Sequence, residues 1–196
     1  MFSKGIIFFL MAKMLMLGFY GFAIFIKPFL LFIGTFTIFC GLLGAFVEKV
    51  IKKFFVYSSM GHVGFMLIGL SFFSIEGASA TFHYLFVYIL SSFLMWFVVM
   101  YIGKNKINLV AFKELKNSNV ILGLIFAFLV FSMSGIPPLG GFFVKLDILF
   151  VLLENFKYYI NYIVFIFSIV SFFYYLRLIK IIFFDIENNY SKKVSK

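Results

Sequence analysis

An apolar run over residues 120–155 is broken by Gly135-Ile136-Pro137-Pro138-Leu139-Gly140-Gly141. The two prolines remove two backbone donors, so a continuous helix cannot pass through this point. Either the run forms two spans joined by a tight turn, or it forms one span made of two half-helices. Helix breaks at membrane depth are tolerated only where protein or a wet cavity satisfies the freed backbone groups. They recur in transporters, because exposed helix ends present their dipoles to ions.

The rest of the chain is also apolar, which indicates an all-helical integral membrane protein. Of the 196 residues, 64% are hydrophobic and 12% are charged, whereas soluble domains are roughly 45–50% apolar. Lys27-Pro28 is expected to separate the first two spans. A single membrane domain over residues 1–184 is expected to precede a polar tail at 185–196. The other expected spans cover residues 5–26, 29–47, 54–73, 80–102 and 159–184.

Charge placement favours one of the two forms of the broken region. If the region crosses the membrane once, about six crossings result. Nearly all basic residues of the linkers and chain ends then lie on one side, and only Lys27 and Lys157 lie on the other. If the region crosses twice, most of this asymmetry is lost. The positive-inside rule therefore favours a single crossing, made of half-helices about 20 Å long that are too short to span alone.

Composition excludes several kinds of site. The single cysteine, Cys40, rules out an internal disulfide, and no Cys/His cluster typical of a metal site is present. The formal charge of +10 does not predict nucleic-acid binding, because the basic residues form short clusters between apolar spans rather than one face. The longest polar linker covers residues 103–119. It forms either a solvated loop or a short surface helix that uses Leu109, Val110, Phe112 and Leu115.

Lys13 and Lys145 stand out because each lies inside a long apolar run. A charge at membrane depth costs at least ~2.5–3.5 kcal/mol, so it marks a candidate ion or proton pathway. A buried amine can release and regain a proton near neutral pH. The alternative is that each lysine reaches the headgroup layer from near a helix end. Asp147 follows Lys145 by two positions and points to another face, so no local ion pair is expected.

His62, Tyr57 and His83 are the other candidate proton carriers. His62 lies near the middle of its span beside Tyr57, and histidine relays protons at physiological pH. A lone histidine on an apolar helix is more often a hydrogen-bonded packing residue. His83 lies near a span end, where an interfacial role fits better. Ser91 and Ser92 are expected to form hydrogen bonds between helices.

Three segments resemble the antiporter-like subunits of respiratory complex I, the NADH:ubiquinone oxidoreductase. Residues 52–66, KKFFVYSSMGHVGFM, resemble the basic turn and YSSxxHxG segment of that family. Residues 131–145, FSMSGIPPLGGFFVK, are similar to its FSxxGIPPLxGFFxK stretch. Residues 173–178, FYYLRL, match a further segment. Their order and spacing are most similar to the subunit 2 branch, of which the chain resembles roughly the second half.

This resemblance implies a membrane-arm subunit of the oxidoreductase that relays protons through two lysines. Lys145 takes the place of the lysine in the family's second broken helix. Lys13, within Met11-Ala12-Lys13-Met14, is similar to the lysine of the helix after the first broken helix. Such subunits carry no redox centre. FMN, iron–sulfur clusters and ubiquinone are therefore expected elsewhere in the complex. This chain itself is expected to hold no cofactor and no metal.

The resemblance also implies partners and a location. The family's other half, which has its own broken helix, lysine and glutamate, has no match here, and no final helix is evident after Phe184. We expect either a separate chain that supplies this half, beside other membrane-arm subunits and lipid, or a structural subunit that has lost pumping. A monovalent cation/proton antiporter subunit is the remaining alternative, which the FYYLRL segment disfavours. The expected location is the mitochondrial inner membrane, with basic loops and both termini on the matrix side.

Overall fold

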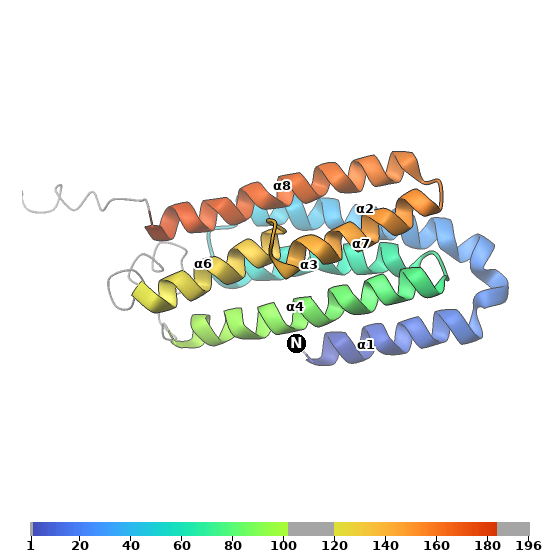
Figure 1. The fold of residues 1–196 in the computed structure, drawn as a ribbon, viewed down its shortest axis with the longest axis horizontal. Helices are drawn as coiled ribbons and strands as arrows, with labels where there is room; N and C mark the ends of the chain where they lie inside the picture. The colour runs from blue at the N-terminus through green and yellow to red at the C-terminus, as the bar shows by residue number, and fades with distance from the viewer. Residues whose placement is uncertain (1, 102–119, 184–196) are drawn as a thin grey trace, which may run out of the picture.

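The computed structural model describes residues 2–101 and 120–183, which form a bundle of roughly aligned helices (Figure 1). Within these two stretches no strand occurs, so the predicted all-helical fold is confirmed. The surface helix considered near Leu109 and the polar tail lie outside the described residues. The α-helices are α1 (Phe2–Lys13), α2 (Ala23–Val47), α3 (Ile51–Leu70), α4 (Ile75–Tyr101), α6 (Val120–Ser134), α7 (Gly140–Glu154) and α8 (Tyr158–Phe183).

Length and composition suit a multi-pass membrane protein. Among the described residues, three helical segments are long and apolar enough to cross a bilayer: Tyr20–Val47, Ile75–Tyr101 and Tyr158–Lys180. Shorter apolar helices cover Gly5–Gly18 and Val120–Ser134. Large apolar side chains such as Phe25 project outward from the bundle. The count of about six crossings stays a prediction.

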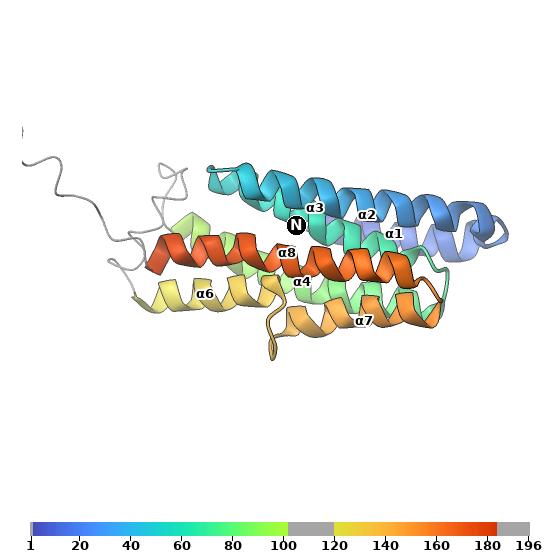
Figure 2. The ribbon, with the colours of Figure 1, turned by 90° about the horizontal axis from the view of Figure 1, so that it is seen from above.

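The broken region is one interrupted pass rather than a hairpin. Helices α6 and α7 lie end to end and run in the same direction (Figures 1 and 2), and both pack against α4 and α8. Helix α6 ends at Ser134 and α7 begins at Gly140. Gly135 has a φ of 87°, a backbone conformation that glycine adopts without steric cost. The predicted discontinuous helix is therefore confirmed.

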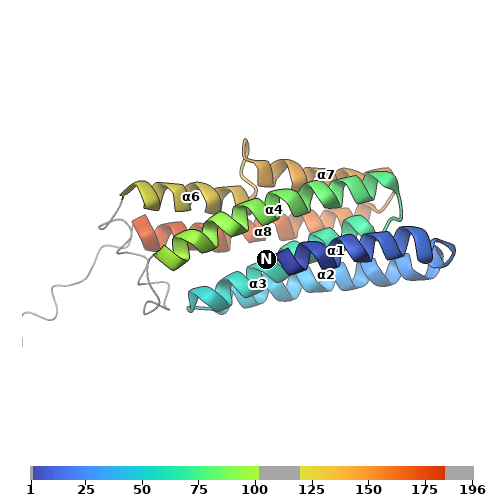
Figure 3. The same ribbon diagram turned by 90° about the horizontal axis from the view of Figure 1, so that it is seen from below.

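The boundary predicted at Lys27-Pro28 is wrong. A π-helical segment (Met14–Gly18) and a 3₁₀ turn (Tyr20–Phe22) separate α1 from α2, which continues through Lys27 and Pro28. Pro28 removes one backbone donor near the start of a long helix, and such a loss is tolerated inside a membrane bundle. Helix α1 packs against α4 at the edge of the bundle (Figure 3).

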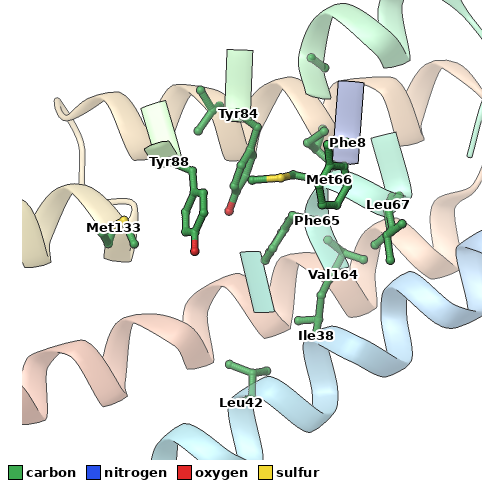
Figure 4. Close-up of a cluster of buried hydrophobic side chains, with 14 of the residues drawn as sticks. Phe8, Ile38, Leu42, Phe65, Met66, Leu67, Tyr84, Tyr88, Met133 and Val164 are labelled. Atoms are coloured by element: carbon green, nitrogen blue, oxygen red, sulfur yellow. The ribbon is translucent and has the colours of Figure 1, made fainter. Parts of the chain in front are cut away.

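Helices α2 and α3 approach so closely that glycine is required between them. A Cβ added at Gly41 would lie 2.6 Å from the backbone nitrogen of Gly61, and one at Gly34 would lie 2.7 Å from the Ile68 side chain. Small residues that let backbones touch are typical of membrane helix pairs. This contact holds α3 in the interior, where Phe65 and Met66 join the buried cluster with Tyr84 of α4 (Figure 4).

The two ends of the bundle carry different charge. The α2–α3 end, where these helices meet, also holds the C-terminal end of α8 (Figure 1). The α7–α8 end holds the turns between α1 and α2, α3 and α4, and α7 and α8. Among the described basic residues, the α7–α8 end has Lys27 and Lys157, and the α2–α3 end has Lys49, Lys52, Lys53, Arg177 and Lys180.

Candidate functional site

Lys145 projects from α7 across the helix break and is held on its far side. Its Nζ donates to the backbone carbonyl of Ser134, 2.7 Å away, and to the hydroxyl of Ser171 in α8, 3.0 Å away. Ser134 ends α6, and the last carbonyls of a helix have no partner within it. The lysine therefore caps α6, where the negative end of the helix dipole also favours an ammonium group. The side chain is only 5% exposed.

The two half-helices meet at closely packed glycines. A Cβ at Gly141 would collide with the carbonyl oxygen of Ser132. A Cβ at Gly135 would lie 3.0 Å from Lys145 Cδ and 3.2 Å from its Nζ. The break thus brings backbone and ammonium together at a spacing that larger residues would disturb.

No carboxylate lies within ion-pair distance of Lys145 in the part of the chain that the structure describes. Asp147 lies on another face of α7, as expected, and its Oδ2 is 3.6 Å from Nδ1 of His83. The Lys145 ammonium is instead surrounded by a carbonyl, a hydroxyl and the Phe65 ring, whose centroid is 5.7 Å from Nζ. An amine in this setting can exchange its proton without breaking an ion pair.

A cavity of about 320 Å³ borders the Lys145 side chain. It has room for several water molecules. Its walls come from the break, from α7 and from α8, and include Ser134, Gly135, Pro137, Lys145, Ser168 and Phe172. The cavity is mostly apolar, and the polar side chains on its wall are those of Ser134, Lys145 and Ser168.

His62 in α3 is buried and hydrogen-bonded through both ring nitrogens. Nδ1 lies 2.8 Å from the Tyr84 hydroxyl of α4, and Nε2 lies 2.9 Å from the Tyr175 hydroxyl of α8. The Tyr175 hydroxyl is also hydrogen-bonded to the Ser58 hydroxyl. These four groups, called the His62 chain below, join three helices. Each of them can both donate and accept a proton.

Small spaces lie beside the His62 chain. One of about 10 Å³ is bordered by His62, Tyr84 and Val144, and therefore reaches α7. Another of about 20 Å³ is bordered by Ser58 and Tyr88. Each is near the size that holds one water molecule. Among the described residues, no direct hydrogen bond joins the His62 chain to Lys145.

The other predicted carriers lie away from this chain. The Tyr57 ring packs beside Gly44 of α2. The His83 side chain is 71% exposed on the outside of the bundle. Lys13 ends α1, and its side chain is exposed because α1 packs one face against α4 and leaves the other uncovered. The described part of the chain therefore does not bury the Lys13 side chain.

The serines of α4 fit their prediction only in part. The Ser91 hydroxyl lies 3.0 Å from Met133 Sδ in α6, so it contacts a neighbouring helix. The Ser92 hydroxyl donates to the Ile89 carbonyl of its own helix.

Comparison with known proteins places this architecture in a family. Residues 2–173 match the family described as "NADH:quinone oxidoreductase/Mrp antiporter, TM". The chain belongs to this family. It is similar to the NADH-ubiquinone oxidoreductase chain 2 of Marchantia polymorpha, with 36% identity over 146 residues, covering 74% of this chain and 30% of that relative. The resemblance to antiporter-like subunits of complex I is thus confirmed.

Solved structures show the same fold within larger assemblies. A chain in the respiratory complex I of Thermus thermophilus with bound aureothin superimposes with a TM-score of 0.73 and 28% identity, covering 82% of this chain and 37% of that chain. A chain of the Mrp complex from Dietzia has a TM-score of 0.79 at 18% identity, covering 91% of this chain and 34% of that chain. The second likeness is one of fold alone. The chain spans about a third of the length of the relatives it matches.

Sequence reasoning missed the partners of both buried carriers. Tyr84, Tyr175 and Ser171 were not among the predicted site residues, although Tyr175 lies in the FYYLRL segment. One signal could have found two of them. Ser171 and Tyr175 are four positions apart on α8, so they share a face of that helix. A polar pair at this spacing in an apolar helix marks the face that binds a buried polar partner.

Proposed function

We propose that this chain is a proton-translocating part of the membrane arm of an NADH:quinone oxidoreductase. The observation that carries the proposal is the position of Lys145, whose ammonium bridges the two halves of a broken helix with no carboxylate in ion-pair distance among residues 2–101 and 120–183. The names of its relatives support the wider assignment, including membership of an oxidoreductase complex. On this proposal, oxidation of NADH elsewhere in the complex biases the protonation of Lys145.

The geometry suggests how a proton would move. Water in the cavity beside the break would deliver a proton to Lys145 Nζ or accept one from it. Loss of that proton weakens the hydrogen bond to the Ser134 carbonyl, because charge-assisted hydrogen bonds are roughly twice as strong as neutral ones. The protonation state of Lys145 is thereby coupled to the end of α6.

The His62 chain is proposed as a second relay toward the α2–α3 end. Its members are joined by hydrogen bonds from Ser58 through Tyr175 and His62 to Tyr84, and each of these groups can act as donor or acceptor. The small space bordered by His62 and Val144 is where one water molecule would link this chain to the α7 side of the break. Tyr57 and His83 have no part in this route.

Unlike Lys145, Lys13 is exposed on the outside of the bundle. Its exposed side chain on α1 would face lipid if nothing covered it, at a cost of ~2.5–3.5 kcal/mol or more. We propose that another membrane-arm chain, which supplies the half of the family pattern missing here, covers Lys13 and continues the proton path. The location that fits these partners is the mitochondrial inner membrane, with the basic α2–α3 end toward the matrix.

The test is replacement of Lys145 in the assembled complex. Lys145→Ala should lower proton pumping and NADH oxidation while the complex, with its flavin and iron–sulfur centres, still assembles. Lys180→Ala is the matched control, because Lys180 is an exposed lysine near the C-terminal end of α8. Unchanged pumping by an assembled Lys145→Ala complex would favour a structural subunit. A requirement for sodium in transport would favour a cation/proton antiporter.

A further inference from the structure

The two basic residues of the α7–α8 end meet in space. Lys27 belongs to α2 and Lys157 lies in the turn between α7 and α8, yet both side chains line the same groove. In the described part of the chain, no carboxylate lies within ion-pair distance of either group. This end of the apolar bundle therefore carries two positive charges with no ion-pair partner among the described residues.

Lys27 is held in place by residues distant in sequence. Its Nζ donates to Asn155 Oδ1, 3.3 Å away, and lies over the Phe72 ring, 4.5 Å from the centroid. The Asn155 amide is itself fixed by a hydrogen bond from Nδ2 to the Val151 carbonyl, 2.9 Å away. A lysine has three donors, and these two contacts engage at most two of them. At least one N–H therefore remains for a ligand.

Both lysines border a groove that extends along α2. The groove has a volume of about 680 Å³. Beyond the lysines its walls include Leu31, Phe32 and Thr35 of α2 and Ile160 of α8. Leu31 and Thr35 lie about one and two turns beyond Lys27 along α2. The groove therefore has its two positive charges near the bundle end, and its wall is mainly apolar from Leu31 onward.

We propose that this groove binds an anionic phospholipid, with the phosphate against Lys27 and Lys157 and an acyl chain along Leu31, Phe32 and Ile160. The order of polar and apolar walls matches the order of headgroup and chain in a bilayer. Basic pockets between membrane helices bind anionic headgroups by this chemistry. A free phosphate ion would use the lysines alone and leave the apolar wall uncovered. The inference does not depend on the proposed proton relay.

The test compares defined lipids on the full chain purified in detergent. Native mass spectrometry would count adducts of dioleoyl phosphatidylglycerol and dioleoyl phosphatidylcholine. The unmodified chain should retain phosphatidylglycerol preferentially. Lys27→Gln/Lys157→Gln should weaken that binding roughly 30-fold, since each lysine near an anionic surface contributes enough for about a five-fold change in affinity. Lys27→Arg/Lys157→Arg, which keeps both charges, should retain most of it.

Lys52→Gln/Lys53→Gln is the matched control, because it removes the same charge from exposed lysines at the α2–α3 end. Equal phosphatidylglycerol binding by this control and by Lys27→Gln/Lys157→Gln would overturn the proposal. So would displacement of the lipid by millimolar inorganic phosphate, or amine crosslinking of Lys157 to a neighbouring chain in the assembled complex. If the glutamine variant does not fold, the unmodified chain and the arginine variant decide, and absence of a preference for phosphatidylglycerol over phosphatidylcholine overturns the proposal.

Discussion

The Lys145 ammonium donates a hydrogen bond to the carbonyl oxygen of Ser134, 2.7 Å away on the other side of the helix break. One residue of α7 therefore satisfies the last carbonyl of α6. The break and the lysine form a single unit, because the interrupted helix supplies the acceptor and the lysine supplies the donor. A continuous helix would have no free carbonyl at this position.

Gly135 should be required at the break. Gly135→Ala would place a Cβ 3.0 Å from Lys145 Cδ in a backbone conformation that side chains rarely adopt. We expect a loss of about 1–3 kcal/mol in stability, measured by thermal unfolding of the chain in detergent. Gly21→Ala is the control, since no atom lies within 4 Å of a Cβ at Gly21. Equal melting temperatures for the two variants would contradict this view of the break.

The Tyr175 hydroxyl should contribute to the stability of the protein. Tyr175→Phe removes the group that bridges His62 and Ser58, and should cost about 1–3 kcal/mol because buried partners lose a hydrogen bond. Tyr162→Phe is the matched control on the same helix, with a side chain that is 67% exposed.

Pumping by the Tyr175→Phe complex separates the two roles of the His62 chain. If the chain carries protons, pumping per assembled complex should fall in Tyr175→Phe and remain normal in Tyr162→Phe. A destabilised Tyr175→Phe complex that pumps normally would leave the chain with a packing role only.

Where Gly41 of α2 meets Gly61 of α3, substitution should be tolerated at Gly61 only. Gly41→Ala would bring a Cβ to 2.6 Å from the Gly61 backbone nitrogen, so the two helices must move apart. Overpacking of this kind typically costs about 1–3 kcal/mol. Gly61→Ala should be nearly neutral, because its Cβ would meet nothing within 4 Å. Thermal unfolding of both variants checks the pair, and equal losses would show that the helices pack differently.

Local sequence chemistry predicted the break and failed at one helix boundary. Pro137 and Pro138 lie between glycines and predict an interrupted helix, because prolines remove backbone donors whatever the tertiary structure. Pro28 was misread as a boundary, because a proline near the start of a long helix removes one hydrogen bond without ending it. The turn instead lies at Met14–Phe22, where glycines rather than a proline were the available signal.

Long-range contacts set the limit of prediction at the site. His62 was identified, but its partners lie 22 and 113 positions away in the sequence. Lys145 was identified with its break, whereas the contact with Ser171 depends on how α8 packs. Lys13 was expected to be buried, and its exposure reflects the edge position of α1, which no local pattern specifies.

The most direct measurement is the number of protons pumped per NADH oxidised by an assembled complex carrying Lys145→Arg. Arginine keeps the charge and the hydrogen-bond donors but cannot be deprotonated in a protein. If Lys145 hands on a proton, this complex should assemble and pump fewer protons per NADH than the Lys180→Arg control. Full pumping by Lys145→Arg would mean that the ammonium only caps α6, and would contradict the relay.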